Sequence, residues 1–205
     1  MSKLLVIVGS TRPTRSADLV LPWLTQKVSG HEAFDAEIVD LRDWPLPIFG
    51  EHFGTIGDFS DPTYSEPIVK AWNDKIKGAD AYVIVTPEYN HSVPGGLKNA
   101  IDSVWVSFGF RNKPVAFVSY GGTACGARAV EQLRLVAIEL GLWPIRSALH
   151  LPLDVYLAVL KEPVPPNPEI FAPLKKTFGV DRVALFLDDL LWSGRALKAA
   201  RASTG

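Results

Sequence analysis

The stretch KLLVIVGSTRPTRSADLV, residues 3–20, indicates how this chain folds and where its function lies. Its first six residues form a short, continuous apolar run, which is typical of a strand buried on both faces of a parallel sheet. A polar loop follows at 9–16, and apolar residues then recur at helical spacing over 16–30. The chain therefore opens with a strand, a loop and a helix.

The same alternation continues along the sequence. We expect further strands at 36–41, 81–86, 113–120 and 142–149, and helices at 66–80, 94–105, 126–141 and 181–200. Pro144 favours an edge position for the last strand, because proline donates no ladder hydrogen bond, and Asp181 is the expected N-cap of the last helix. Right-handed crossovers then give one parallel sheet with helices on both faces. The length of 205 residues predicts a single domain, 1–205.

Composition and charge exclude several classes of protein. Hydrophobic residues make up 47% of the chain and charged residues 21%, as in ordinary globular proteins. The net charge of −1 offers no basic surface, so we expect no nucleic-acid partner. We find no signal peptide, and no apolar run approaches the ~20 residues that span a bilayer. With a single cysteine, these features predict a cytoplasmic protein without a membrane partner.

Three loops follow predicted strands at their carboxyl ends, where ligands bind in sheets of this kind. We call GSTRPTRS (9–16) the first loop, TPEYNHSVPGG (86–96) the second loop and SYGGTACGA (119–127) the third loop. All three are rich in small, hydroxyl or turn-forming residues. They are therefore the candidate functional segments.

The first loop precedes a predicted helix, so its backbone N–H groups and the helix dipole favour an anion there. Arg12 and Arg15 can add charge-assisted hydrogen bonds. Hydroxyl donors are available from Ser10, Thr11, Thr14 and Ser16. The loop has neither G-x-G-x-x-G nor G-K-[ST], so it predicts a phosphate monoester site. The alternative is a polar turn with Ser16 as the helix N-cap.

The second loop is long and stiffened by prolines at both ends. Its backbone can lie against a planar ring and contact the ring's edge through N–H and C=O groups. The alternative is an ordinary connection with Ser92 as a cap. His91 stands alone, and no spacing of His, Cys, Asp and Glu in the chain resembles a metal site.

Together the three loops resemble the signature segments of the NADPH-dependent FMN reductase family, over about residues 3–150. The resemblance implies a flavodoxin-like three-layer sandwich with a five-stranded parallel sheet in the order 2-1-3-4-5. It implies bound FMN, NADPH or NADH as hydride donor, and a small acceptor: flavin, quinone, azo or nitro compound, or chromate. It also implies a homodimer or homotetramer with the flavin pocket near a subunit interface.

The resemblance further implies which residues contact the cofactor. The 5′-phosphate would be held by Ser10, Arg12, Arg15 and Ser16. One border of the isoalloxazine would be formed by Pro87, Glu88, Tyr89 and Asn90. The other edge of the ring would be flanked by Ser119, Tyr120, Gly121 and Gly122. No side-chain acid or base is expected to be catalytic, because the flavin carries the redox chemistry.

Several features leave alternatives open. Three aromatic residues, Trp105, Phe108 and Phe110, are either a second layer over the ring, or residues that pack in the outer layer or at a dimer contact. The 2′-phosphate of NADPH has Arg111 and Arg128 as candidate readers, although both are also typical surface residues. Cys125 follows the glycine pair at a predicted helix N-terminus, where thiols are often reactive. A catalytic or redox-sensing cysteine and a small residue tolerated in a tight loop are both compatible with that position.

The proline-rich segment 151–179 predicts a long loop, either an arm or lid near a partner's active site or a surface excursion. Two other functions compete with the reductase. A flavodoxin-type electron carrier shares fold and cofactor, but such carriers are typically strongly acidic, unlike this chain. A hydrolase is the other candidate, although the chain has no G-x-S-x-G motif.

Overall fold

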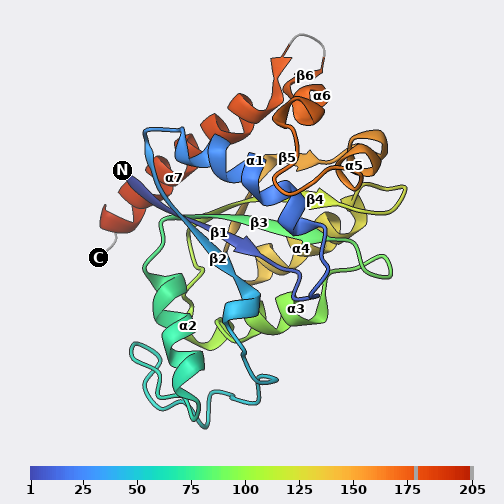
Figure 1. Cartoon of the computed structure of the whole chain (residues 1–205). Helices are drawn as coiled ribbons and strands as arrows, with labels where there is room; N and C mark the ends of the chain where they lie inside the picture. The colour runs from blue at the N-terminus through green and yellow to red at the C-terminus, as the bar shows by residue number, and fades with distance from the viewer. Residues whose placement is uncertain (178–179, 204–205) are drawn as a thin grey trace.

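The computed structural model describes residues 1–177 and 180–203 (Figure 1). Its centre is a parallel sheet in the order β2-β1-β3-β4-β5, which confirms the predicted fold class and the edge position of the last strand. The strands are β1 (Ser2–Val8), β2 (Phe34–Asp40), β3 (Ala81–Pro87), β4 (Pro114–Tyr120) and β5 (Trp143–His150). A short antiparallel pair, β6 (Lys176–Thr177) and β7 (Val180–Asp181), lies apart from this sheet.

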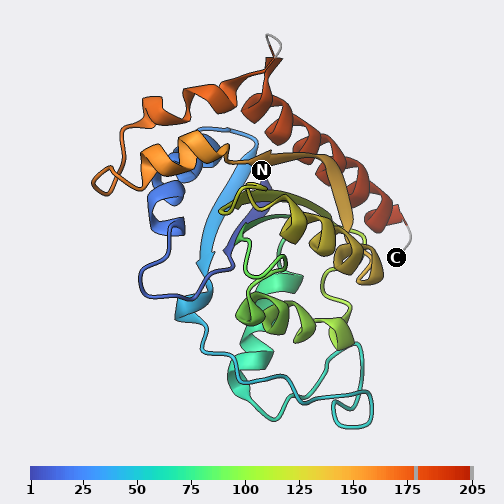
Figure 2. The same cartoon turned by 90° about the vertical axis from the view of Figure 1, so that its right-hand side faces the viewer.

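Helices cover both faces of the sheet and form a three-layer sandwich (Figure 2). One face carries α1 (Ala17–Ser29), α5 (Leu153–Val159) and α7 (Arg182–Ser203), and the other carries α2 (Pro67–Lys77), α3 (Gly95–Asp102) and α4 (Ala127–Glu139). The carboxylate of Asp181 accepts hydrogen bonds of 3.0 Å from the N–H groups of Val183 and Ala184, which confirms it as the cap of α7.

The continuous apolar runs of the central strands are explained by burial on both faces. Side chains alternate along β1, so that Leu4, Val6 and Val8 pack under α1 and α7, whereas Leu5 and Ile7 pack under α2 and α3. Every residue of β3 and β4 is buried. The sheet is therefore a rigid platform, and its carboxyl edge holds the loops that follow β1, β3 and β4.

The segment 151–179 differs from the predicted loop. Its described part contains α5, the 3₁₀ helix η3 (Pro168–Phe171) and the short helix α6 (Ala172–Lys175). Pro152 and Pro168 precede or begin these elements, where a missing N–H has no cost. Phe171 stacks on Trp23 of α1 at a centroid distance of 4.6 Å, so the segment packs onto its own chain.

Two smaller 3₁₀ helices, η1 (Leu41–Asp43) and η2 (Trp105–Ser107), follow β2 and α3. The helix predicted at 94–105 ends earlier, at Asp102, and the hydroxyl of Ser103 donates back to the carbonyl of Asn99. In the described part of the chain, no helix combines the length and the apolar character that crossing a bilayer requires.

Candidate functional site

The first, second and third loops converge at the carboxyl edge of the sheet. The hydroxyls of Ser10 and Tyr89 lie 2.8 Å apart, which joins the first loop to the second. The N–H of Glu88 donates to the carbonyl of Tyr120 at 3.2 Å, which joins the second loop to the third. The guanidinium of Arg12 lies 3.8 Å from the centre of the Tyr89 ring. The structure therefore brings the three predicted segments together.

The backbone of the first loop presents a row of free donors. Among residues 1–177 and 180–203, the backbone N–H groups of 10–12, 14 and 16 make no hydrogen bond. These groups precede the N-terminus of α1, whose dipole favours negative charge. Successive unpaired N–H groups at a helix N-terminus are the usual chemistry of a phosphate site.

Arg15 has a different place from the one predicted. Its guanidinium is buried and donates to the carbonyl of Ser10 and to the carboxylates of Asp18 and Asp40, so that its five N–H groups are all used within the chain. Arg42 binds the same two carboxylates. Arg15 therefore shapes the first loop from below and has no donor left for a phosphate.

Asp40 is held as an anion by this arrangement. Burial alone would raise the pKa of its carboxyl group, but hydrogen bonds from Arg15 and Arg42 outweigh burial and lower the pKa to about 2. Burial alone would lower the pKa of Arg15, but its hydrogen bonds to Asp40 and Asp18 raise that pKa. The cluster is therefore charged over the whole neutral pH range.

Ser16 occupies the N-cap position of α1, as the alternative interpretation expected, but its side chain makes no capping hydrogen bond. Its hydroxyl lies 2.9 Å from the hydroxyl of Tyr156, which projects from α5. The ring of Tyr156 stacks at 6.0 Å on that of Tyr120, at the end of β4. A residue of the C-terminal segment thus reaches the first loop.

The second loop is fixed by side chains on α4. The carboxylate of Glu88 is 5% exposed and accepts hydrogen bonds from the guanidinium and the N–H of Arg128, at 2.7 and 3.2 Å. Tyr89 and Ser92 close a tight turn through two backbone hydrogen bonds, with Asn90 and His91 at positive φ between them. The side chain of Glu88 therefore positions the loop. The other residues of the turn can then border a ligand.

Ser119 has a supporting place in the third loop. It is fully buried, and its hydroxyl lies 2.9 Å from the carbonyl of Cys125 and 2.7 Å from Nδ1 of His150. The hydroxyl of Ser119 donates its single proton to the carbonyl of Cys125. Its oxygen therefore accepts the second hydrogen bond, which Nδ1–H of His150 donates. Burial, then the charges of Arg182 and Arg134, lower the pKa of His150. Ser119 is therefore no activated nucleophile, and this pair gives the hydrolase alternative no support.

Tyr120 turns its side chain away from the third loop and into the core beneath α1 and α5. It is 2% exposed, and its hydroxyl is buried without a hydrogen-bond partner in the described chain. Burial raises the pKa of this hydroxyl, so it stays protonated. Gly121 and Gly122 follow with φ of 94° and 62°, and a Cβ on Gly122 would meet no atom within 4 Å. The backbone of the glycine pair is thus open to a ligand, whereas the tyrosine side chain is not at the predicted ring edge.

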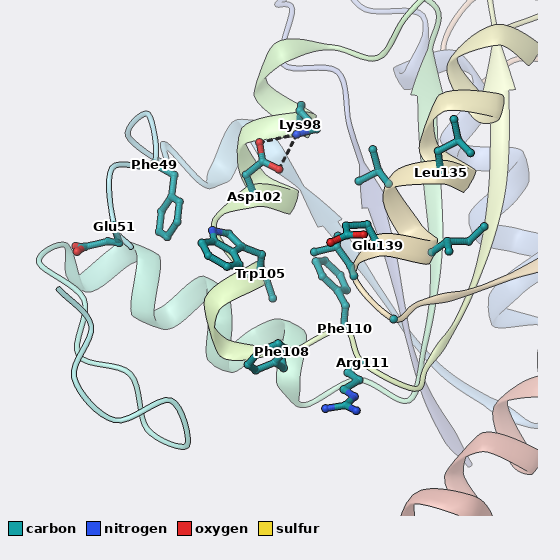
Figure 3. Close-up of a pocket in the computed structure, with 15 residues that line it drawn as sticks. Phe49, Glu51, Lys98, Asp102, Trp105, Phe108, Phe110, Arg111, Leu135 and Glu139 are labelled. Atoms are coloured by element: carbon teal, nitrogen blue, oxygen red, sulfur yellow. Dashed lines mark hydrogen bonds and ion pairs between the residues drawn. The ribbon is translucent and has the colours of Figure 1, made fainter. Parts of the chain in front are cut away.

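The predicted aromatic second layer lies elsewhere. Figure 3 shows Trp105, Phe108 and Phe110 around a cavity of about 1060 Å³ that α3 and α4 border from two sides. None of the lining residues belongs to the three loops. Trp105 packs edge-on against Phe53, and Phe110 is buried against Tyr82. Arg111 lines the same cavity, and Arg128 pairs with Glu88. Trp105 and Phe110 are therefore packing residues within this chain, whereas Phe108 is 49% exposed at the cavity.

Cys125 adopts a φ of 55° and is half-buried, and its Sγ lies 3.9 Å from the carbonyl of Thr123. Within the described residues, no group of three His, Cys, Asp or Glu side chains is placed to bind a metal ion.

Sequence reasoning missed Asp40, His150 and Tyr156. The first two lie at the carboxyl ends of β2 and β5, so the rule that selected the three loops could have found them. Tyr156 lies in the segment predicted as a loop, and no local pattern marks it.

The chain is similar in sequence and in fold to several known proteins. The family profile described as NADPH-dependent FMN reductase matches residues 2–154. An NAD(P)H-dependent FMN reductase of Schizosaccharomyces pombe is 37% identical over 179 residues, covering 86% of this chain and 87% of that protein. An NAD(P)H:quinone oxidoreductase of Solanum tuberosum is 35% identical over 114 residues, covering 53% and 52%. The solved structure of a flavoenzyme NAD(P)H:acceptor oxidoreductase from Paracoccus denitrificans aligns with a TM-score of 0.57 at 21% identity, covering 96% and 95%.

Proposed function

The chain belongs to the NADPH-dependent FMN reductase family, and on that premise we propose how its three loops hold the cofactor and where its acceptor enters. It is an FMN-dependent NAD(P)H oxidoreductase that passes electrons to a small acceptor. The flavodoxin-type carrier is not favoured, because the family and the relatives are named for their dependence on NAD(P)H.

The residues at the carboxyl edge of the sheet fit FMN. The free N–H groups of the first loop match a phosphate, and they are the single observation that carries the proposal. The unpartnered hydroxyl of Tyr120 offers a further buried donor beside them. The open space over Gly122 lets the backbone approach a flat ring.

We assign the predicted residues as follows. The phosphate contacts Arg12 and Ser16 together with the backbone N–H groups of the first loop, and Ser10 orients Tyr89. Arg15 holds the loop in shape. The ring is bordered by the backbone of 87–90 and by Gly121 and Gly122, whereas the side chains of Glu88 and Ser119 fix the two loops that carry those contacts.

FMN, when bound, supplies the chemistry by accepting a hydride from NAD(P)H and passing electrons to the acceptor in a second half-reaction, which gives ping-pong kinetics. The protein orients the ring through backbone groups that the ion pair Glu88–Arg128 and the bond Ser119–Cys125 make rigid. Arg12 adds positive charge beside the phosphate. No side chain is needed to move a proton.

Three further features of the proposal concern the whole protein. The acceptor is a small molecule of the quinone or flavin type, since an open ring face admits planar compounds. We propose a cytoplasmic enzyme, because that compartment supplies reduced nicotinamide nucleotides. We also propose a homodimer, supported by Leu135 and Ile138 of α4, which are 71% and 64% exposed on a helix that begins at the third loop.

The proposal is tested by the visible spectrum of the purified protein. We expect the absorption bands of bound oxidised FMN, and anaerobic addition of NADPH or NADH should bleach them, faster with NADPH. An electron carrier would keep its colour in this experiment. Folded protein that is colourless and does not bind added FMN at micromolar concentrations would contradict the proposal.

A further inference from the structure

The C-terminal segment contributes a polar group to the first loop across 140 residues of sequence. The hydroxyl of Tyr156, on α5, lies 2.9 Å from the hydroxyl of Ser16, immediately before α1. The side chain of Ser16 makes this contact and no capping hydrogen bond to α1. Tyr156 lies beyond residue 154, where the match to the family profile ends. This contact therefore belongs to the part of the chain that the family signature does not describe.

Tyr120 adds a third hydroxyl beside this pair. Its ring lies parallel to that of Tyr156 within 28°, and its buried hydroxyl has no partner in the described chain. Tyr89, Arg15, Tyr156 and Asp18 all lie close enough to influence it electrostatically. The Tyr120 ring stacks on that of Tyr156, whose hydroxyl is bonded to Ser16, so Tyr120 lies one contact away from the first loop. We call Ser16, Tyr120 and Tyr156 the hydroxyl cluster.

The hydroxyl cluster has protons that a ligand can accept. The hydroxyls of Ser16 and Tyr156 are bonded to each other, and the buried hydroxyl of Tyr120 has no partner in the described chain, so one proton of the pair and that of Tyr120 are available to a further acceptor. A buried hydroxyl without a partner is costly, so a ligand that accepts from it gains affinity. Hydrogen bonds to a charged acceptor are about twice as strong as those to a neutral one. A phosphate dianion offers only acceptors, whereas the free 5′-hydroxyl of riboflavin also brings a proton of its own.

We propose that Tyr156 and Tyr120 donate to the cofactor's phosphate and so select FMN over riboflavin, an inference that rests on the proposed function. Helix α5 thereby adds a side-chain donor to the backbone N–H groups of the first loop. A purely structural role is the competing explanation, in which the bond between Ser16 and Tyr156 only fastens α5 to α1. The two explanations differ in whether loss of the hydroxyl affects both flavins or FMN alone.

The test compares Tyr156→Phe and Tyr120→Phe with the wild type by titrating each apoprotein with FMN and with riboflavin and following flavin fluorescence. Each variant should bind FMN about 10-fold more weakly, the loss expected for one hydrogen bond to a charged group. The affinity for riboflavin should change less than about 2-fold, because riboflavin has no phosphate to which the deleted hydroxyl would donate. The ³¹P resonance of bound FMN should also shift.

Tyr64→Phe is the matched control. It deletes a tyrosine hydroxyl that makes a 2.9 Å bond to Asn73 of α2, on the opposite face of the sheet, and both flavin affinities should be retained. Ser16→Asp is a second variant, in which a carboxylate repels the phosphate and should reduce FMN binding far more than riboflavin binding. Equal losses for the two flavins, or no loss of FMN affinity, would overturn the inference. A wild type that binds neither flavin would instead overturn the proposed function.

Discussion

The guanidinium of Arg15 lies at the centre of a four-residue cluster beneath the first loop. Asp18 and Asp40 balance the charges of Arg15 and Arg42, so the cluster adds no net charge to the phosphate site. Its contribution is geometric, because the bond from Arg15 to the carbonyl of Ser10 turns the loop's carbonyl inward and leaves the N–H groups facing out. The residue that adds charge to the site is Arg12, which rests on the Tyr89 ring.

Asp40→Asn should therefore weaken both the fold and FMN binding. Removing one partner of this buried pair should lower the free energy of unfolding by about 2 kcal/mol at pH 7, since Asp18 still accepts from Arg15. The folded pKa of Asp40 is about 2, below its ordinary value of 3.8. The stabilisation is thus complete above pH 4 and is lost as the pH falls toward 2.

Denaturant unfolding between pH 2 and 7 measures this effect. The wild type should lose stability more steeply with acid than Asp40→Asn does. Asp43→Asn is the control, because Asp43 is exposed and lies only three residues away. Parallel pH profiles for the wild type and Asp40→Asn would show that the cluster does not stabilise the first loop.

At this scale, sequence patterns identify the right loops but not the direction of their side chains. Ser10, Arg12 and Tyr89 were predicted in the site and do lie together. Arg15, Glu88 and Ser119 were assigned to the cofactor by their position in the loops, and the structure turns each toward a partner in its own chain. Those partners, such as Asp40 and His150, come from other strands, which a local pattern cannot show.

Among the secondary-structure elements, strand β5 shows how an exposed sheet edge is protected. Between Val115 and Phe117, β4 faces a stretch of β5 from Pro144 to Ala148, so β5 bulges there. The guanidinium of Arg134, on α4, donates to the carbonyls of Ile145 and Arg146 in the bulge, at 2.7 and 3.1 Å. Arg182 binds the carbonyl of Ala148. Bulges and charged side chains are the devices that keep sheet edges from pairing with other chains.

Arg134→Ala should therefore destabilise β5 and expose its edge. Two carbonyls lose their donor, so the free energy of unfolding should fall by about 2 kcal/mol. Concentration-dependent light scattering at 37 °C should increase as edges pair. Arg195→Ala, which removes the same charge from an exposed position on α7, should leave both measurements unchanged. Unchanged scattering in Arg134→Ala would show that the edge is protected by other means.

The sequence predicts a helix or strand correctly wherever apolar residues form a continuous run or recur at helical spacing. All five strands and the helices α1, α2, α4 and α7 were predicted within three residues of their observed bounds. Helix α5 was missed because prolines before and after it suggested a continuous loop, although Pro152 stands at the helix start, where it is tolerated. Its burial against α1 is a tertiary effect, since Val155 and Val159 pack into the core of residues far away in sequence.

For the molecule as a whole, the proposed dimer needs a surface that meets a second copy. Among the exposed large apolar side chains, two helices each carry a pair: Leu135 and Ile138 on α4, and Leu185 and Trp192 on α7. Helix α4 starts at the third loop and carries Arg128, the partner of Glu88, so its face is continuous with the flavin site. The cavity in Figure 3, with Trp105 on one side and Leu135 on the other, hollows this same face. These features favour the face of α4 over that of α7 as the proposed dimer interface.

Replacing both Leu135 and Ile138 with glutamate should therefore convert the proposed dimer into a monomer of 22.4 kDa, measured by size-exclusion chromatography with light scattering. Two buried charges in an apolar interface cannot be compensated, whereas both positions are exposed in the single chain, so the monomer should keep its fold and circular dichroism. Trp192→Glu is the matched control, because Trp192 is 74% exposed on the other face and should not affect assembly. Dissociation caused by Trp192→Glu alone would show that the interface lies on α7. A wild type of monomeric mass at micromolar concentration would contradict the dimer on either face.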